Sequence, residues 1–232
     1  MASPHEYVFH PTKGGREGVY FVLGLNAILI ALLLVLVVHR VVEPISTGPR
    51  TAIVFAFELV EILSPLVIFH FLLRKFDKTY WKTPRLGRAV FWMAGTEAPP
   101  DVSGSYVTTM DCFEPDTASG GARNGYNADI TIKQTWRTMA VILRFRDYPI
   151  RADARSESEM AVLRVEIDDT VSLGFEYCHK GIVERPGKGV FETQIHGFTN
   201  LHFRREENRW NALGTYFDAD AGSGKMTLKP GP

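Results

Sequence analysis

Hydrophobic positions form two long runs at the start of the chain, before the pattern changes near residue 100. Residues 19–38 contain no charged side chain and one amide, that of Asn26. At a rise of about 1.5 Å per residue, a helix of this length spans the roughly 30 Å hydrocarbon layer of a bilayer. Residues 52–73 form a second apolar run of similar length. The pattern predicts a two-helix transmembrane hairpin over residues 19–73.

The second run is unusual because it carries Glu58, Glu61 and Pro65, whose spacing places them on one helix face. An ionised side chain at the centre of a transmembrane helix costs about 2.5–3.5 kcal/mol even on insertion scales, so such residues usually have a functional partner. In an antiparallel hairpin, Asn26 lies level with Val67 and away from the depth of Glu61. We therefore expect Glu58 and Glu61 to act in an assembly of several chains. The alternative is that they stay protonated or hydrogen-bonded within a passive bundle.

Basic residues near the ends of the two runs predict the orientation of the hairpin. Residues 74–88 hold six basic residues against one acidic residue, whereas the loop between the runs holds Arg40 and Arg50. Because positive charge favours the cytoplasmic side of a membrane, we expect both termini to be cytoplasmic. A cleaved signal peptide is disfavoured, because the first run is too long and no small-residue cleavage site follows it.

Two polar segments flank the hairpin. Residues 1–18 show no usable pattern and are interpreted as a short cytoplasmic tail. Residues 74–99 interleave basic and aromatic side chains, as expected of a juxtamembrane linker that lies along the lipid headgroups. Thr83 followed by Pro84 is a typical helix start, so a short interfacial helix is expected over residues 84–93.

From residue 102 the hydrophobic pattern repeats every two residues, which indicates β-strands. The strands are expected at residues 104–112, 126–136, 139–148, 157–168, 171–179, 190–203, 210–217 and 225–229, with a possible break at Gly197. Short links between about eight consecutive strands favour a small up-and-down antiparallel β-barrel over residues 100–232, because closure removes exposed edges. Such a barrel just fills with side chains or holds one small ligand. The expected fold class is a membrane-anchored all-β protein.

Alternation within the strands predicts which side chains face the barrel interior. The inward sets are Ile130, Ile132, Gln134 and Trp136; Val141, Leu143 and Phe145; and Val171, Leu173, Phe175, Tyr177 and His179. Aromatic faces beside a few hydrogen-bonding groups near strand ends are what a ligand pocket at a barrel mouth requires. An ordinary barrel core capped by aromatic residues is the other interpretation.

The motif content gives little support to catalysis. Gly-Ser-Gly-Lys at residues 222–225 lacks the flanking residues of a phosphate-binding loop. The histidines have no HExxH or paired-cysteine context, so no metal site is expected, and no nucleophile–base arrangement indicates an enzyme. Cys112 and Cys178 are expected to be free thiols in a reducing compartment.

The order of segments over residues 19–229 resembles that of a known family. Two hydrophobic spans and an aromatic-basic linker precede PPDVSGSY at 99–106, ITIKQTW at 130–136, LGFEYCH at 173–179, HGFTNLHF at 196–203, LGTYF at 213–217 and GSGKMTL at 222–228. This order resembles the two-transmembrane, strand-rich effectors of bacterial CBASS anti-phage systems, which accompany a CD-NTase nucleotidyltransferase. The first strand carries Gly-Ser-Tyr where the family pattern has Gly-Thr-Trp, which leaves a barrel-floor packing role to Tyr106.

The resemblance implies a cytoplasmic barrel that binds a cyclic dinucleotide made by the nucleotidyltransferase. Ligand-induced homo-oligomerisation and disruption of the inner membrane would then kill the infected cell. Neither a further cofactor nor a DNA or RNA polymer is expected. The expected ligand contacts are Tyr106, Trp136 and Tyr177 for base stacking, Gln134, Thr199 and Asn200 for base edges, and Arg144 for phosphate. Because alternation points Arg144 outward, a solvated arginine is the alternative.

A second interpretation is a lipocalin-like carrier or scaffold, in which the barrel holds an apolar ligand or a partner protein. The hairpin would then only tether the barrel to the bilayer. A barrel lined solely by aliphatic side chains would favour this interpretation, and an enzyme ranks third.

Overall fold

The structure, a computed structural model, divides the chain into two compact units. One unit combines Met1–His10 with Pro99–Pro232, and the other is Pro11–Ala98. The structure describes residues 4–10, 15–42, 65–113, 125–146, 155–166, 168, 170–185, 189–207, 209–219 and 223–231. Glu58 and Glu61 lie outside these residues, so their predicted role stays a prediction.

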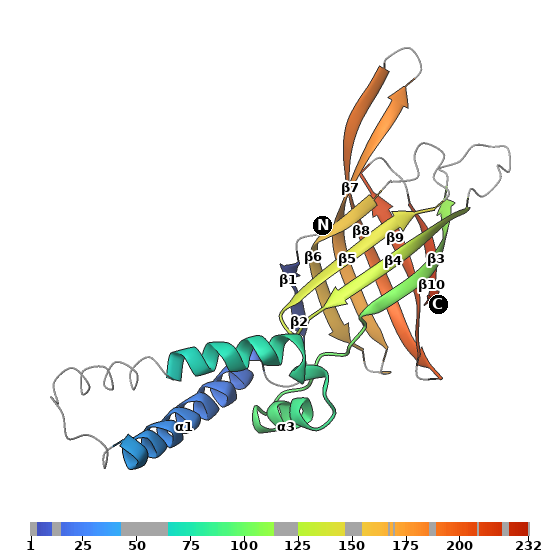
Figure 1. Cartoon of the computed structure of the whole chain (residues 1–232). Coiled ribbons are helices and arrows are strands. Elements are labelled where there is room, and N and C mark those ends of the chain that lie inside the picture. The colour runs from blue at the N-terminus through green and yellow to red at the C-terminus, as the bar shows by residue number, and fades with distance from the viewer. Residues whose placement is uncertain are drawn as a thin grey trace. The chain divides into compact units, whose positions relative to one another are not determined.

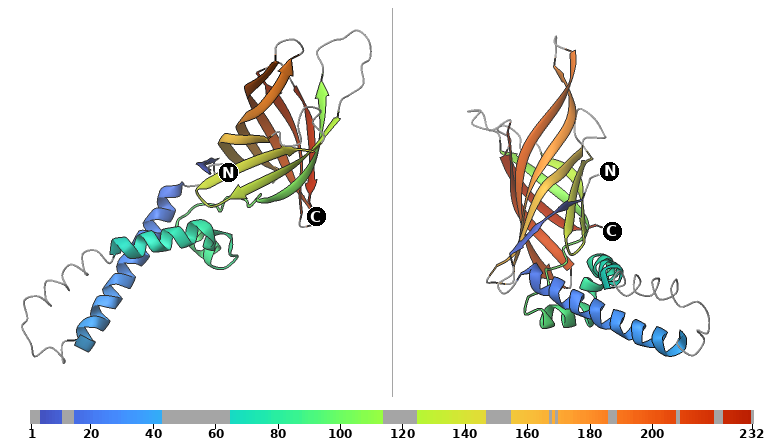
Figure 2. Two further views of the ribbon diagram at one scale, coloured as in Figure 1. Left: turned by 45° about the horizontal axis from the view of Figure 1, so that its top comes forward. Right: turned by 90° about the vertical axis from the view of Figure 1, so that its left-hand side faces the viewer.

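The first unit is a closed antiparallel β-barrel of eight strands that follow one another along the chain (Figures 1 and 2). The strands are β3 (Gly104–Phe113), β4 (Gly125–Gln134), β5 (Thr138–Phe145), β6 (Arg155–Val165), β7 (Val171–Arg185), β8 (Gly189–Glu206), β9 (Arg209–Asp218) and β10 (Ser223–Pro230). Each strand pairs with the next, and β10 pairs back with β3. The predicted up-and-down barrel is confirmed, and β8 runs unbroken through Gly197.

One seam of the barrel is filled by the N-terminus of the chain. Strands β5 and β6 pair directly only between residues 142–144 and 155–157. Beside them, β1 (His5–Glu6) pairs with β5, and β2 (Val8–His10) runs parallel to β6. Tyr7 lies between these two strands and is 1% exposed, so the N-terminus belongs to the barrel core.

The interior of the barrel is a packed core in which most of the predicted inward positions are confirmed. Residues 130, 132 and 134 of β4, 141 and 143 of β5, and 171, 173 and 175 of β7 are all buried. Phe145 and Tyr177 are partly buried and pack against this core, whereas Trp136 lies in the turn that follows β4. His179 belongs to β7, but its side chain is not described.

The second unit contains α1 (Arg16–Val42), which carries no charged side chain between residues 18 and 38. Among the described helices, α1 alone is long and apolar enough to cross a membrane. Its amide side chain is satisfied within the helix, because Asn26 Nδ2 donates to the Val22 carbonyl at 2.8 Å. Residues 65–78 are helical, but most of the predicted second span lies outside the described residues. The two-span prediction is therefore supported for one helix.

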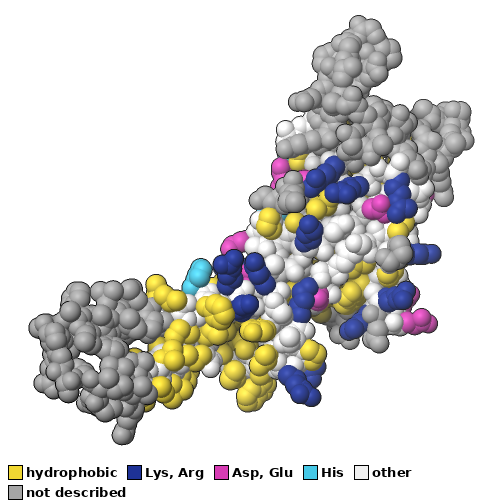
Figure 3. Space-filling view, in the orientation of Figure 1, with side chains coloured by type: hydrophobic (Ala, Val, Ile, Leu, Met, Phe, Trp, Pro, Cys, Tyr) yellow, Lys and Arg dark blue, Asp and Glu magenta, His cyan; other side chains and the backbone are white. Residues whose placement is uncertain are grey.

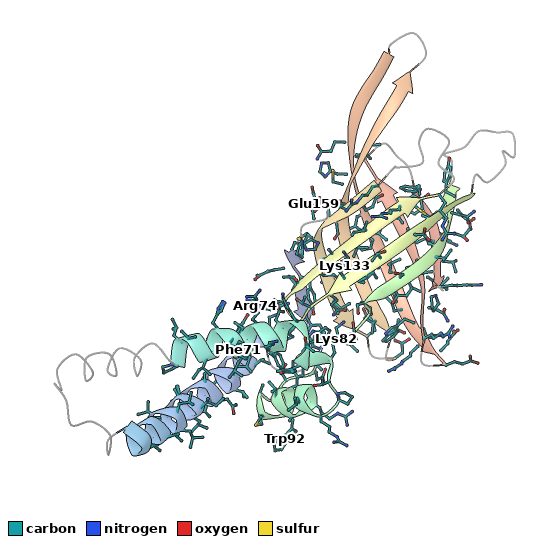
Figure 4. All side chains as sticks on the ribbon, in the orientation of Figure 1. Phe71, Arg74, Lys82, Trp92, Lys133 and Glu159 are labelled. Atoms are coloured by element: carbon teal, nitrogen blue, oxygen red, sulfur yellow. The ribbon has the colours of Figure 1, made fainter. Side chains whose placement is uncertain are left out.

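Two short helical elements follow, a 3₁₀ turn η1 (Tyr80–Lys82) and the α-helix α3 (Leu86–Met93). Helix α3 corresponds to the interfacial helix predicted over residues 84–93 and begins two residues later than predicted. Phe91 of α3 is buried against Phe76 with ring centroids 5.6 Å apart, whereas Trp92 is 81% exposed (Figure 4). Hydrophobic side chains cover much of the visible described surface of this unit (Figure 3). Such a surface suits contact with lipid.

Candidate ligand-binding site

Strands β7 and β8 project beyond one end of the barrel, here called the hairpin end (Figure 1). Aromatic side chains line the barrel interior near this end. Tyr216 of β9 is buried in the core, and three partly buried rings pack against the same core. These rings are Tyr126 of β4, Phe145 of β5 and Tyr177 of β7. They come from strands on several sides of the barrel, so the hairpin end presents ring faces toward a shared interior.

Two glycines make room for two of these rings. A Cβ atom at Gly197 would lie 2.4 Å from the Tyr177 ring, and one at Gly224 would lie 2.6 Å from the Tyr216 ring. The barrel wall therefore accepts both rings only because these positions lack a side chain. The Tyr177 hydroxyl also donates to the Phe217 carbonyl at 3.4 Å, which helps to orient its ring.

Buried hydroxyl groups accompany the rings. Thr199 of β8 is buried and stands in register between Phe175 of β7 and Tyr216 of β9. Thr108 of β3 is fully buried, and its Oγ1 has no hydrogen-bond partner among the residues that the structure describes. An unsatisfied buried hydroxyl calls for a water or a ligand, because leaving such a group unpaired costs free energy. The interior thus combines stacking surfaces with hydrogen-bonding groups.

At the opposite end, here called the linker end because β3 begins there, two of the predicted ligand residues, Gln134 and Tyr106, form hydrogen bonds within the protein. Gln134 Oε1 accepts from the Val102 amide at 3.0 Å, and its Nε2 donates to the Pro100 carbonyl at 3.0 Å and to the Tyr7 hydroxyl at 3.3 Å. Tyr106 donates its hydroxyl proton to the Val102 carbonyl at 2.8 Å. Burial and the nearby charge of Asp101 raise the pKa of Tyr106 to about 12.

The other predicted contacts are spread over the barrel. Trp136 is buried in the turn between β4 and β5, at the linker end and outside the core cluster. Arg144 is exposed, and Asn200 lies between inward-facing neighbours with its Nδ2 3.2 Å from His202 Nε2. The structure therefore brings Tyr177 and Thr199 to the hairpin end and Tyr106 and Gln134 to the linker end. It does not join all seven residues in one site.

Three basic residues occupy paired positions on β5, β6 and β7 near the hairpin end. Arg144 of β5 is in register with Arg155 of β6, which is in register with Lys180 of β7. Glu157 forms an ion pair with Arg155, so part of this positive charge is compensated. Arg144 alternates with the inward-facing Leu143 and Phe145, so this charge lies on the outer wall at the hairpin end and not in the barrel interior.

Sequence reasoning missed Tyr126, Tyr216 and Thr108. The sequence did contain a signal for Tyr216. This tyrosine stands two residues after Gly214, and the next strand carries Gly224, whose missing side chain leaves room for the Tyr216 ring. Neither models of known protein families nor the curated proteins match this chain.

Proposed function

We propose that this chain is a membrane-anchored effector of the CBASS type, whose barrel binds a cyclic dinucleotide at its hairpin end. The observation that carries the proposal is the interior of aromatic rings and hydroxyl groups around Tyr177, Thr199 and Tyr216. A cyclic dinucleotide offers two bases to stack and two phosphates to neutralise. Stacking on an aromatic side chain contributes about 1–3 kcal/mol per base.

The N-terminal strands support a membrane hairpin. Residues 1–10 and 99–232 belong to the same barrel unit, so the chain between them leaves that unit and returns to it. If α1 crosses the bilayer, the returning chain crosses it a second time, because one body lies on one side of the membrane. Residues 52–73 are the second apolar run that could provide this crossing.

The same strands offer a route from ligand to membrane. β2 ends at His10 and α1 begins at Arg16, so the seam strands and the membrane helix are close neighbours along the chain. A ligand that alters the fit of β5 and β6 around Tyr7 would therefore act on the start of α1. The population shift cannot exceed the difference in ligand affinity between the two states. The proposed output is oligomerisation and disruption of the bacterial inner membrane.

Nucleotide binding to the purified full chain in detergent tests the proposal. The full chain is needed because Tyr7 belongs to the barrel core. Isothermal calorimetry with a panel of cyclic di- and trinucleotides should show binding of at least one member. Tyr216→Ala should weaken that binding about tenfold to a hundredfold, since one stacking partner is lost. Phe217→Ala is the matched control, because the adjacent Phe217 is 56% exposed.

Binding by no member of the panel would refute the nucleotide proposal. Binding of a fatty acid or another apolar probe in its place would support the lipocalin-like alternative. The described interior carries tyrosine and threonine side chains beside its aliphatic ones, which favours the nucleotide over a purely apolar ligand.

Glu58 and Glu61 test the output step. Replacing both by leucine should leave membrane insertion and nucleotide binding intact while reducing toxicity and ion leakage, because their proposed partners exist only in the assembly. Unchanged toxicity and leakage in a protein that still inserts would remove the glutamates from the mechanism.

A further inference from the structure

Three potential metal ligands meet on the outer wall of the barrel, where the β7–β8 hairpin begins to project. They are Glu159 of β6, Cys178 of β7 and His196 of β8, and one ligand atom from each lies within 4.8 Å of the other two. Figure 4 labels Glu159 at this place. The spacing of these residues in the sequence does not predict the group, because each member comes from a different strand.

Strand register and a bulge bring the three side chains together. Cys178 and His196 are direct cross-strand partners. In β6 the register shifts between Ser158 and Met160, so Glu159 is the extra residue of a bulge and has no cross-strand partner. A bulge re-aims the side chain it carries, and here it turns Glu159 toward the Cys178–His196 pair.

The donor atoms suit a borderline metal ion such as Zn²⁺, which binds thiolate, imidazole and carboxylate. His196 Nδ1 lies 3.5 Å from Glu159 Oε2. In a tetrahedral site with metal–ligand bonds of about 2.0–2.2 Å, nitrogen and oxygen ligands stand roughly this far apart. The pair therefore needs little movement to share one ion.

Gln194 supplies the outer partner that metal-binding histidines usually have. Its side-chain amide lies 3.3 Å from His196 Nε2. Because the oxygen and nitrogen of a side-chain amide can exchange places by a flip, the Gln194 oxygen can accept the Nε2 proton. That hydrogen bond leaves the Nδ1 lone pair directed at the metal position.

Burial distinguishes the cysteine from its partners. Cys178 is 3% exposed, whereas the side chains of His196 and Glu159 are about half exposed. The thiol is thus covered while solvent reaches the other two ligands, which gives an ion both an entry path and a fourth, water-occupied position.

We infer that Glu159, Cys178 and His196 form a zinc-binding site that ties β6, β7 and β8 together at the base of the hairpin. The site stands on the opposite face of the wall from the Tyr177–Gly197 pair, since residues 177 and 178 alternate, as do 196 and 197. The metal site does not depend on nucleotide binding, and either can fail without the other.

Cobalt binding to the metal-free full chain in detergent tests the inference. One Co²⁺ per chain should bind and produce a thiolate-to-cobalt absorption band in the near ultraviolet, and Zn²⁺ should displace it. Cys178→Ser should abolish the band, whereas Cys112→Ser should retain it and is the matched control. Gln194→Ala should weaken binding about tenfold, as expected of an outer partner. A band that survives Cys178→Ser, or no band in the unaltered chain, would overturn the site.

Two further variants keep the test decisive if Cys178→Ser does not fold. Glu159→Gln and His196→Asn change half-exposed side chains, so they leave the barrel core intact. Each should weaken cobalt binding at least tenfold without lowering the thermal midpoint of the metal-free protein by more than a few degrees. Cobalt affinity unchanged in both variants would place the ion elsewhere and overturn the inference.

Discussion

At the residue scale, Tyr106 shows how burial converts a predicted ligand contact into a structural group. Its hydroxyl donates to the Val102 carbonyl, and its pKa is raised from 10.0 to about 12 by burial and by Asp101. A raised pKa means that the folded protein holds the phenol proton more tightly than the unfolded chain does. The resulting stability is fully present below pH 10 and is lost as the pH rises through about 12.

Tyr106→Phe should therefore change stability in a pH-dependent way. Below pH 10 the variant should be about 1 kcal/mol less stable, because the Val102 carbonyl loses its donor. Between pH 10 and 12 this difference should shrink, since only the unaltered protein has this phenol to ionise. Urea unfolding across this range measures it, and an equal difference at both ends would contradict the assignment.

Gly197 gives a second prediction at this scale. In Gly197→Ala, the added methyl group would lie 2.4 Å from the Tyr177 ring and 2.5 Å from the Phe217 carbonyl. We expect a loss of about 1–3 kcal/mol in stability from overpacking, together with weaker nucleotide binding. Gly174→Ala is the control, because its methyl group would meet only the ring of Phe198, at 3.1 Å. Thermal unfolding and calorimetry of both variants decide the comparison.

Alternation alone predicted that Gln134 and Tyr177 belong to the barrel interior or its ends. It could not predict that the Gln134 amide is already hydrogen-bonded to the main chain at Pro100 and Val102 and to the hydroxyl of Tyr7, which lies 127 positions away along the chain. Contacts at that separation depend on barrel closure. The difference between a linker end held by hydrogen bonds and a hairpin end lined by aromatic rings therefore depends on the three-dimensional structure.

At the element scale, β1 and β2 are the least predictable part of the barrel. They have two and three residues, too few for a period of two to stand out. The eight barrel strands are longer and most end at turn-forming residues, so most of their bounds follow from the local pattern, although β7 continues to Arg185, beyond its predicted end at residue 179. The structure shows why a seam exists, since the Ser158 hydroxyl accepts from the Val141 amide at 2.9 Å and is also hydrogen-bonded to His5 at 2.8 Å.

Removing the side chain of Tyr7 should open this seam. Tyr7→Ala deletes a fully buried ring, and such truncations cost about 3–5 kcal/mol. Amide hydrogen exchange should accelerate first in residues 138–139 of β5 and 162–164 of β6, which pair with β1 and β2. Val8→Ala is the control, because Val8 is 47% exposed. Equal exchange in the two variants would show that the N-terminus contributes nothing to the seam.

At the scale of the whole molecule, the barrel unit is linked twice to the unit that contains α1, once through residues 10–16 and once through the segment that ends at Pro99. Both links begin in one folded unit, so a crossing by α1 requires a return crossing. The pattern of the sequence predicts the second link, as the linker over residues 74–99, but it does not tie residues 1–10 to the barrel. The pairing of β1 and β2 adds that constraint.

Labelling with a membrane-impermeant maleimide tests this topology, in a chain whose two cysteines are replaced by serine. A cysteine in place of Ser46, in the loop between the apolar runs, should react in intact cells. A cysteine in place of Thr227, exposed on β10, should react only after lysis, because the barrel is expected on the cytoplasmic side. Failure of both positions to react in intact cells would mean that α1 does not cross the bilayer. Reaction at position 227 but not at position 46 would mean that the orientation is the reverse of the predicted one. Reaction at both positions would contradict the two-span hairpin, because the seam strands hold residues 5–10 and the barrel on one side.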